Sequence, residues 1–219
     1  MKLSEYALTV LKNFSTINSS VILNPGNLQC TMAPDDSIVV EAELEEITPE
    51  KFSVYDLNQF LGNVTTLNNP ELTFTSKTAT MDDGSTKLTY YSCAPGIIKS
   101  PPEGKSITLK NPDYSFLLTN STLSKLKKIA DMNELPHISL VCKNGVVRLQ
   151  AHERKNDTSN YASSLIEENS TCNDFFDTFK AENFKLIPDD YNVQVKHDAF
   201  AIFTSTSKKL KYVIAMEAA

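Results

Sequence analysis

The feature that most constrains the fold is that one order of predicted elements occurs twice. Each half of the chain is predicted to run from an amphipathic helix through a hairpin and strands to a second helix and further strands. The apolar residues of the two leading helices align at a constant offset. The paired positions are Leu8 with Leu123, Leu11 with Leu126, Phe14 with Ile129 and Ile17 with Met132. Self-similarity at a fixed offset indicates a duplication, and 219 residues suffice for two domains of about 100 residues each.

A proline-rich segment separates the two halves. Residues 94–113 contain four of the ten prolines, which is typical of a linker. Apolar residues in this segment predict that it packs in an extended form: Ile97, Ile98, Ile107 and Leu109. The predicted domains are residues 1–108, with a connecting linker at about 94–112, and residues 109–219. Helices on antiparallel sheets predict an α+β class with two similar domains, each with two helices.

Caps and turn signals set the bounds of the local elements. Helices are predicted at 4–17, 57–64 and 121–132, with a short helical piece at 181–186. Hairpins are predicted to join 21–23 to 28–32 around Gly26 and, on an Asn-Gly signal, 138–142 to 146–151. Two strands are predicted after the second helix, at 72–77 and 86–92.

Composition excludes several classes of protein. The chain has 21 basic and 27 acidic residues, a balance that argues against a histone-like protein that wraps nucleic acid. There is no run of about 20 apolar residues and no apolar core of a signal peptide, so we expect a soluble and, if Met1 is the true start, intracellular protein without membrane contact. The four cysteines form no CxxC pair, and we expect no metal site.

The sequence also lacks the common catalytic motifs. GxGxxG, Walker A, GxSxG and HExxH are all absent. The histidines are scattered, at His137, His152 and His197, and are expected at surfaces or strand edges. The chain therefore reads as a non-enzyme without a cofactor.

Two alternatives remain open. One is a structural or binding module of a virion or a secreted protein, decorated at N-x-S/T triplets. The six triplets begin at Asn13, Asn18, Asn63, Asn120, Asn156 and Asn169. The other alternative is an enzyme whose site is assembled from scattered residues.

Charge is placed unevenly along the chain. Lys12 lies on the polar side of the first helix, and Lys125, Lys127 and Lys128 lie on the corresponding helix of the second half, whereas acids gather on strands and turns such as 41–50. A charged helix face is usually only solvated. Its repetition on duplicated helices of an acidic protein suggests instead one surface that meets phosphate while the rest repels it.

Several runs of residues resemble one family of proteins. The runs are MKLS at 1–4, LKNF at 11–14 with Ile17-Asn18-Ser19, YDLN at 55–58 with Phe60-Leu61, and YVIAMEA at 212–218. With them, the chain closely resembles the DNA polymerase sliding clamp of T-even-type tailed bacteriophages. The resemblance covers the whole length and is loosest at 94–113 and 150–180.

The resemblance implies a ring of three identical subunits with helices around double-stranded DNA and sheets outside. It implies that an ATP-dependent clamp loader opens the ring and that the replicative DNA polymerase tethers to a pocket between the domains. It also implies a role in late viral transcription with factors associated with RNA polymerase, in the cytoplasm of an infected bacterial host.

The resemblance and the charge pattern together assign candidate residues. Those expected to face DNA are Lys12, Lys125 and Lys128, followed by Lys2, Lys127, Lys180 and Lys185. Those expected to line the partner pocket are Ile97, Ile98, Ile107, Leu109, Tyr212, Val213, Ile214 and Met216. Those expected at the subunit interface, where one strand edge pairs with another, are Thr86, Leu88, Tyr90, Tyr161, Ser163 and Leu165.

Overall fold

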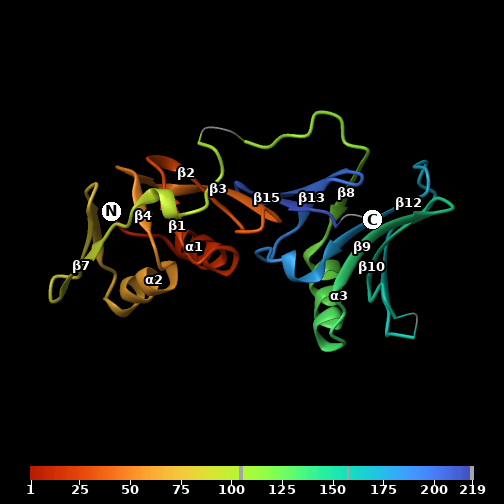
Figure 1. The fold of residues 1–219 in the computed structure, drawn as a ribbon, viewed down its shortest axis with the longest axis horizontal. Helices are drawn as coiled ribbons and strands as arrows, with labels where there is room; N and C mark the ends of the chain where they lie inside the picture. The colour runs from red at the N-terminus through yellow and green to blue at the C-terminus, as the bar shows by residue number, and fades with distance from the viewer. Residues whose placement is uncertain (104–105, 157, 218–219) are drawn as a thin grey trace. The chain divides into compact units, whose positions relative to one another are not determined.

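The computed structural model describes residues 1–103, 106–156 and 158–217. The chain divides into two compact units, Met1–Ser106 and Ile107–Ala219, and each is described here by itself. The division falls within the segment that the sequence predicts as a linker. Figure 1 labels the helices and strands of both units.

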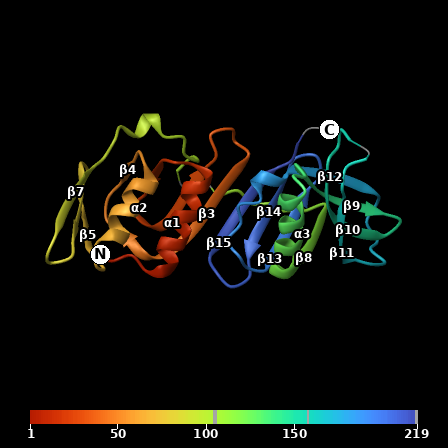
Figure 2. The same cartoon turned by 90° about the horizontal axis from the view of Figure 1, so that it is seen from below.

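The first unit combines helices with small antiparallel sheets. Its elements are α1 (Glu5–Ile17), β1 (Val21–Leu23), β2 (Gly26–Met32), β3 (Ile38–Thr48), β4 (Phe52–Val54), α2 (Leu57–Thr66), β5 (Glu71–Phe74), β6 (Thr78–Asp82), β7 (Lys87–Tyr91) and the 3₁₀ turn η1 (Pro95–Ile97). β1 pairs with β4, β2 pairs with β3, and β5, β6 and β7 form a sheet in that order. Figure 2 shows α1 and α2 side by side.

The helix α1 forms where the sequence predicts it. The Ser4 hydroxyl accepts a hydrogen bond from the Ala7 amide at 3.1 Å, which caps the free N–H groups of the first turn. Val10 and Phe14 are fully buried on one face. Burial of each such side chain stabilises the unit by about 2 kcal/mol. Aromatic rings continue the core towards the last sheet, where Phe60 meets Tyr90 edge-on with ring centroids 5.3 Å apart.

The predicted hairpin between β1 and β2 is wrong, because β1 pairs with β4 instead. The reason is the side chain of Gln29, which takes the backbone groups that such a hairpin would use. Its amide group accepts from the Asn24 N–H at 2.8 Å and donates to the Asn24 carbonyl oxygen at 2.9 Å. One buried glutamine therefore closes the turn.

The sequence also predicts two strands where the structure has three. The chain turns between β5 and β6, at a point placed inside the expected strand 72–77. There the Thr75 hydroxyl accepts a hydrogen bond from the Thr78 amide at 3.0 Å. A hydroxyl that bonds the backbone locally competes with a continuous strand.

The second unit has two antiparallel sheets and a helix. Its elements are β8 (Tyr114–Leu118), α3 (Asn120–Met132), β9 (His137–Lys143), β10 (Val146–His152), β11 (Ala162–Glu167), β12 (Phe175–Lys180), the 3₁₀ turn η2 (Ala181–Asn183), β13 (Tyr191–Lys196), β14 (Phe200–Ser205) and β15 (Leu210–Ala215). One sheet has the order β11-β10-β9-β12, and β8, β13, β14 and β15 are neighbours in the other. α3 packs against β10 and β11.

The hairpin of β9 and β10 is confirmed. Asn144 and Gly145 have φ angles of 51° and 74°, the left-handed conformation that a two-residue turn of this kind needs. Residues from His137 to Lys143 pair in register with Val146 to His152.

The second unit has one α-helix in its described residues where the duplication predicts two. The expected piece at 181–186 contains only the 3₁₀ turn η2. Two buried tyrosines hold the following backbone in a non-helical path, because the Tyr191 hydroxyl donates to the Ile187 carbonyl oxygen and the Tyr212 hydroxyl accepts from the Ile187 amide at 3.2 Å. No helix in the described part of the chain is long and apolar enough to cross a bilayer.

Candidate nucleic-acid interface

Lys12 on α1 and Lys128 on α3 occupy equivalent places relative to the core. Lys12 lies midway between buried Val10 and Phe14, and Lys128 lies in the same way between two buried positions, 126 and 130. Residues two apart point to opposite sides of a helix, so both lysines project away from the core and are exposed.

This equivalence shifts the expected alignment of the helices by one residue. The sequence paired Ile17 with Met132, yet Ile17 is buried whereas Met132 is 75% exposed. The N-cap of α3 is Thr119, whose hydroxyl accepts from the Thr122 amide at 3.2 Å. With the shift, buried Val10 and Phe14 of α1 correspond to buried positions 126 and 130 of α3, and Lys12 corresponds to Lys128.

The other candidate lysines differ in their surroundings. Lys125 is exposed on α3. Lys127 is half-buried, and its Nζ donates to the Phe184 carbonyl oxygen at 2.7 Å, so its ammonium group ties α3 to the chain after η2. Lys180 lies 4.0 Å from Glu182, and Lys185 is half-buried. Lys125 is therefore a better phosphate contact than these three.

Lys2 lies beside carboxylates. It lines a polar hollow of about 300 Å³ together with Asn68, Asn69, Glu71, Asp82 and Asp83. The Asp83 carboxylate accepts hydrogen bonds from the Thr86 amide and from the Asn68 amide. These bonds, the Thr86 bond most of all, hold the pKa of Asp83 far below its usual range. The hollow keeps a negative charge at neutral pH, which weakens any attraction of Lys2 for phosphate.

α2 presents a neutral polar face. Asp56 caps the helix by accepting from the Gln59 amide at 2.9 Å. Leu57, Phe60, Leu61 and Val64 are buried, whereas Asn58 and Gln59 are exposed. The first unit therefore offers one lysine on its helices, at Lys12.

An apolar pocket of about 320 Å³ lies wholly within the first unit. It is lined by Asn24, Pro25, Leu28, Cys30, Glu41, Pro101, Pro102, Glu103 and Ser106. Polar contacts hold two of the lining residues in place: Glu103 pairs with Lys51, and the Ser106 hydroxyl donates to the Glu41 carboxylate at 2.6 Å. Leu28 is 49% exposed at the pocket. Sequence reasoning missed this pocket, although the Pro101-Pro102 pair was a signal for it.

The residues predicted to line a partner pocket differ in how far they are buried. Tyr212 and Ile214 are 1% and 0% exposed in the core of the second unit, where Tyr212 packs edge-on against Tyr191 with centroids 6.1 Å apart. Val213 and Ile98 are also buried. Those left accessible are Ile97 and Ile107, which are exposed, and Leu109 and Met216, which are half-buried. The buried residues hold the fold and do not offer anchors to a partner.

The predicted interface residues lie on or beside two edge strands. β7 is the last strand of β5-β6-β7, and β11 is the first strand of β11-β10-β9-β12. Tyr161 and Leu165 are 58% and 45% exposed, and Ser163 is exposed with them. On the other edge Thr86 is exposed, Leu88 is half-buried, and the Tyr90 hydroxyl donates back to the Asp56 carbonyl oxygen at 3.2 Å.

No group of three or more His, Cys, Asp or Glu side chains among the described residues is placed to hold a metal ion. The histidines belong to local networks: the His152 ring contacts the Ser139 hydroxyl at 2.8 Å, and His137 lies 3.2 Å from the Glu217 carboxylate. Burial, helped by the charge of nearby His137, lowers the pKa of His152.

Known proteins resemble this chain in sequence. A family model described as DNA polymerase processivity factor matches residues 2–94. The sliding clamp of Vibrio phage KVP40 is 29% identical over 222 residues, covering 100% of both chains. The sliding clamp of Enterobacteria phage T4 is 23% identical and covers 100% of this chain and 97% of the relative. The predicted resemblance to phage sliding clamps is confirmed.

Solved structures confirm the fold. An H. pylori beta clamp has a TM-score of 0.73 at 12% identity, covering 100% of this chain and 65% of that one. The A. fulgidus PCNA, solved with the C-terminal region of FEN-1 bound, has a TM-score of 0.70 at 14% identity, covering 97% and 95%. The chain has an α+β clamp fold. The matches in sequence support the function of a sliding clamp, or processivity factor, for DNA polymerase.

Proposed function

We propose that three copies of this chain form a closed ring around double-stranded DNA and tether the replicative DNA polymerase during processive synthesis. The observation that carries the proposal is the match to phage sliding clamps over the entire chain. A ring is retained by its topology, so its contacts with DNA need to be few and weak. The two proposed domains, 1–108 and 109–219, each contribute to the inner surface.

The inner surface is proposed to contact phosphates through Lys12, Lys125 and Lys128. All three are exposed on α1 or α3, and contacts of lysines with phosphate attract DNA without reading its sequence. Lys2, Lys180 and Lys185 rank below them because of their carboxylate neighbours or burial, and Lys127 because it bonds Phe184. The sparse charge suits a protein that slides.

Ring closure is proposed to pair β7 of one copy with β11 of the next. Both strands end their sheets, and an edge strand presents unpaired N–H and C=O groups that can receive another strand. Exposed Tyr161 and Leu165 would add apolar burial beside these backbone bonds.

A partner site is proposed at the apolar pocket of the first unit. The pocket joins exposed Leu28 with Pro101 and Pro102 of the linker, and exposed Ile97 and Ile107 lie on the same segment of chain. The A. fulgidus PCNA structure holds the C-terminal region of a partner, which supports a peptide tail as the occupant here. A few apolar anchors in such a pocket give an attachment that can be released.

The remaining parts of the proposal follow from the resemblance to phage sliding clamps. The ring carries out no catalysis and binds no cofactor, and a separate clamp loader opens it with ATP in the cytoplasm of the infected bacterium. The partners include factors of late viral transcription. These roles need the same partner site that the polymerase uses.

The lysine assignment is tested by a triple substitution, Lys12→Glu, Lys125→Glu and Lys128→Glu. We expect loss of DNA retention after loading with an unchanged fold, because exposed substitutions shift stability by under about 0.5 kcal/mol. The matched control makes the same change of charge at exposed Lys77, Lys143 and Lys155, which lie outside the helices. Equal retention by the two triple variants would contradict the assignment.

A further inference from the structure

Two cysteine thiols of the second unit lie in direct contact. The Sγ atoms of Cys142 and Cys172 are 2.8 Å apart, although the residues are 30 positions apart in the sequence. This separation is longer than the roughly 2.05 Å of a disulfide bond, so both cysteines are free thiols. Cys142 lies on β9 and is 2% exposed, and Cys172 is half-buried in the connection from β11 to β12.

Hydrogen bonds to the β9–β10 turn fix this connection on both sides of Cys172. The Ser170 amide donates to the Gly145 carbonyl oxygen at 2.8 Å, and the Asn144 amide donates to the Asp174 carboxylate at 2.9 Å. The Ser170 hydroxyl also donates to the Cys172 sulfur at 3.2 Å. Because the backbone is already ordered here, joining the two sulfurs costs little further conformational entropy.

Gly145 is necessary for this close approach. Its φ angle is +74°, and a Cβ atom at this position would lie 3.0 Å from the Ser170 carbonyl oxygen. A side chain there would push the connection, and Cys172 with it, away from β9. The position of the thiol pair therefore depends on a glycine outside it.

We propose that Cys142 and Cys172 form a redox-active thiol pair, which a low-molecular-weight disulfide such as oxidised glutathione converts into an intrachain disulfide. The Cys172 thiolate attacks one sulfur of the oxidant, forming a mixed disulfide and releasing one glutathione thiolate. The Cys142 thiolate then attacks the Cys172 sulfur and releases the second. The two protons lost by the cysteines go to the two released thiolates, and the oxidant takes up the two electrons.

The order of the steps follows from accessibility and charge. Cys172 is the more exposed sulfur and meets the oxidant first. Burial, and then the neighbouring Cys172, raise the pKa of Cys142 to about 11. Because the thiolate is the attacking species and burial disfavours it, the second step accelerates as the pH rises.

The disulfide would bond the β11–β12 connection covalently to β9, and β10 and β11 would lie within the closed loop of chain. A cross-link between distant residues lowers the conformational entropy of the unfolded chain. The oxidised protein should therefore unfold at a higher temperature than the reduced protein. The inference concerns only the second unit and does not rest on the proposed clamp function.

The experiment treats the full-length protein with oxidised glutathione, alkylates the remaining thiols and maps the peptides by mass spectrometry. Before alkylation, we expect the intact mass to be lower by two hydrogen atoms. After alkylation, we expect one linked pair of peptides carrying Cys142 and Cys172, and alkylated Cys30 and Cys93. Cys142→Ser should instead retain one glutathione on Cys172, whereas Cys172→Ser should leave Cys142 unmodified. The control variant Cys30→Ser with Cys93→Ser should form the same cross-link as the natural chain.

Two results would overturn the proposal. One is full alkylation of Cys142 and Cys172 after prolonged oxidation, and the other is linkage of either one to Cys30 or Cys93. The geometry is tested separately with Gly145→Ala, checked for folding by circular dichroism. If that variant does not fold, Ser170→Ala removes the hydroxyl that bonds the Cys172 sulfur and keeps the backbone bond to Gly145. We expect cross-linking to slow by roughly tenfold while glutathione still adds to Cys172. An unchanged rate in the folded variant would contradict the role given to the contact.

Discussion

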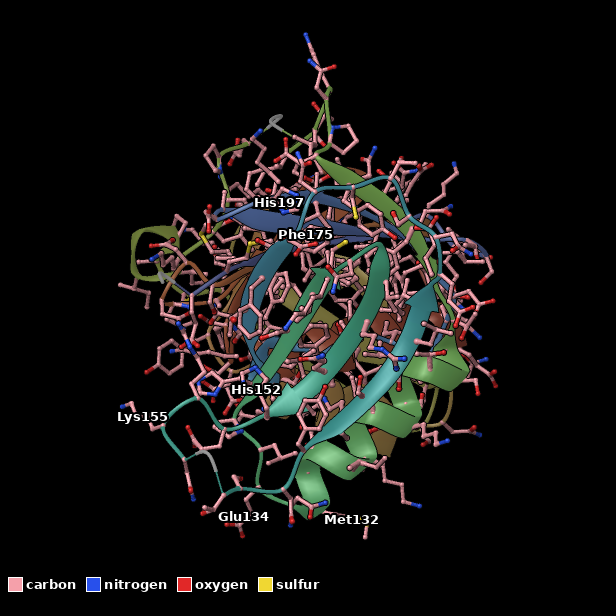
Figure 3. The ribbon with its side chains drawn as sticks, turned by 90° about the vertical axis from the view of Figure 1, so that its right-hand side faces the viewer. Met132, Glu134, His152, Lys155, Phe175 and His197 are labelled. Atoms are coloured by element: carbon pink, nitrogen blue, oxygen red, sulfur yellow. The ribbon has the colours of Figure 1, made fainter. Side chains whose placement is uncertain are left out.

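The carboxylate of Asp177 on β12 lies 2.5 Å from Nδ1 of His197, in the turn between β13 and β14. The Asp177 side chain is 2% exposed and also accepts a hydrogen bond from the Asp198 amide at 3.2 Å. The Phe175 ring lies beside the imidazole, tilted by 38° to it, with ring centroids 4.5 Å apart (Figure 3). Because β12 and β13–β14 belong to different sheets, this contact joins the two sheets of the second unit.

Removing this carboxylate should destabilise the second unit. We expect Asp177→Ala to lower the free energy of unfolding by about 3 kcal/mol, because the imidazole and the Asp198 amide both lose their partner in a buried place. Urea unfolding measures this, with exposed Glu168→Ala as the control. A difference of under about 0.5 kcal/mol between the two variants would count against the contact as a structural link.

The Asp189 carboxyl should make the free energy of unfolding depend on pH in the acid range. Burial raises the pKa of this carboxyl, but the hydrogen bonds from Ser205 and Ser207 outweigh it and lower the pKa to about 2. A carboxyl with a depressed pKa stabilises the folded state above its unfolded pKa, and this stability is lost as the pH falls. We expect the free energy of unfolding to decrease between about pH 4 and pH 2. Asp189→Asn should flatten this decrease and the exposed control Asp131→Asn should not, whereas equal slopes would refute the assignment.

The edge strand β11 offers a test of ring closure. Successive N–H groups of a strand point to opposite sides, so one of Ser163→Pro and Ser164→Pro removes an N–H on the open edge, and the other removes one that faces β10. We expect at least one of the two variants to be a folded monomer by light scattering, while the natural chain has three times the mass of 24.3 kDa. Intact trimers of both variants would place the interface elsewhere.

The apolar pocket of the first unit should bind a partner tail. We expect Leu28→Glu to weaken binding of a polymerase tail peptide by tenfold or more, which corresponds to about 1.4 kcal/mol, because a charge would enter an apolar pocket. Ile47→Glu is the matched control, since Ile47 is an exposed apolar residue of β3 that does not line the pocket. Calorimetry or amide shifts on titration measure both, and equal affinities would show that the peptide binds another surface.

Local signals were sufficient for most elements of the fold. The spacing of Val10 and Phe14, the cap at Ser4 and the Asn144-Gly145 turn each specify their structure within a few residues, and the sequence predicted all of them. The pairing of β1 with β4 was not predictable in this way, since it depends on the side chain of Gln29 bonding backbone groups outside its own strand.

The site was less accessible to prediction than the fold. Exposure of Lys12 and Lys128 follows from helical spacing. Lys127, in contrast, donates its hydrogen bond to the Phe184 carbonyl oxygen, and this depends on where a segment distant in the sequence lies against α3. The alternation that marks Tyr212 and Ile214 as apolar does not say whether they face a core or a groove. Only the packed second unit shows that they are buried.

The central claim is that the chain encircles DNA, and retention on circular against linear DNA tests it most directly. Labelled protein is loaded on a nicked circular duplex with its clamp loader and ATP, the loader is washed away, and half of the sample is cut once with a restriction enzyme. We predict that protein stays on the circles and leaves the cut molecules by sliding off their ends. Equal retention on both forms would mean that contact with DNA, rather than a closed ring, holds the protein, and would contradict the account.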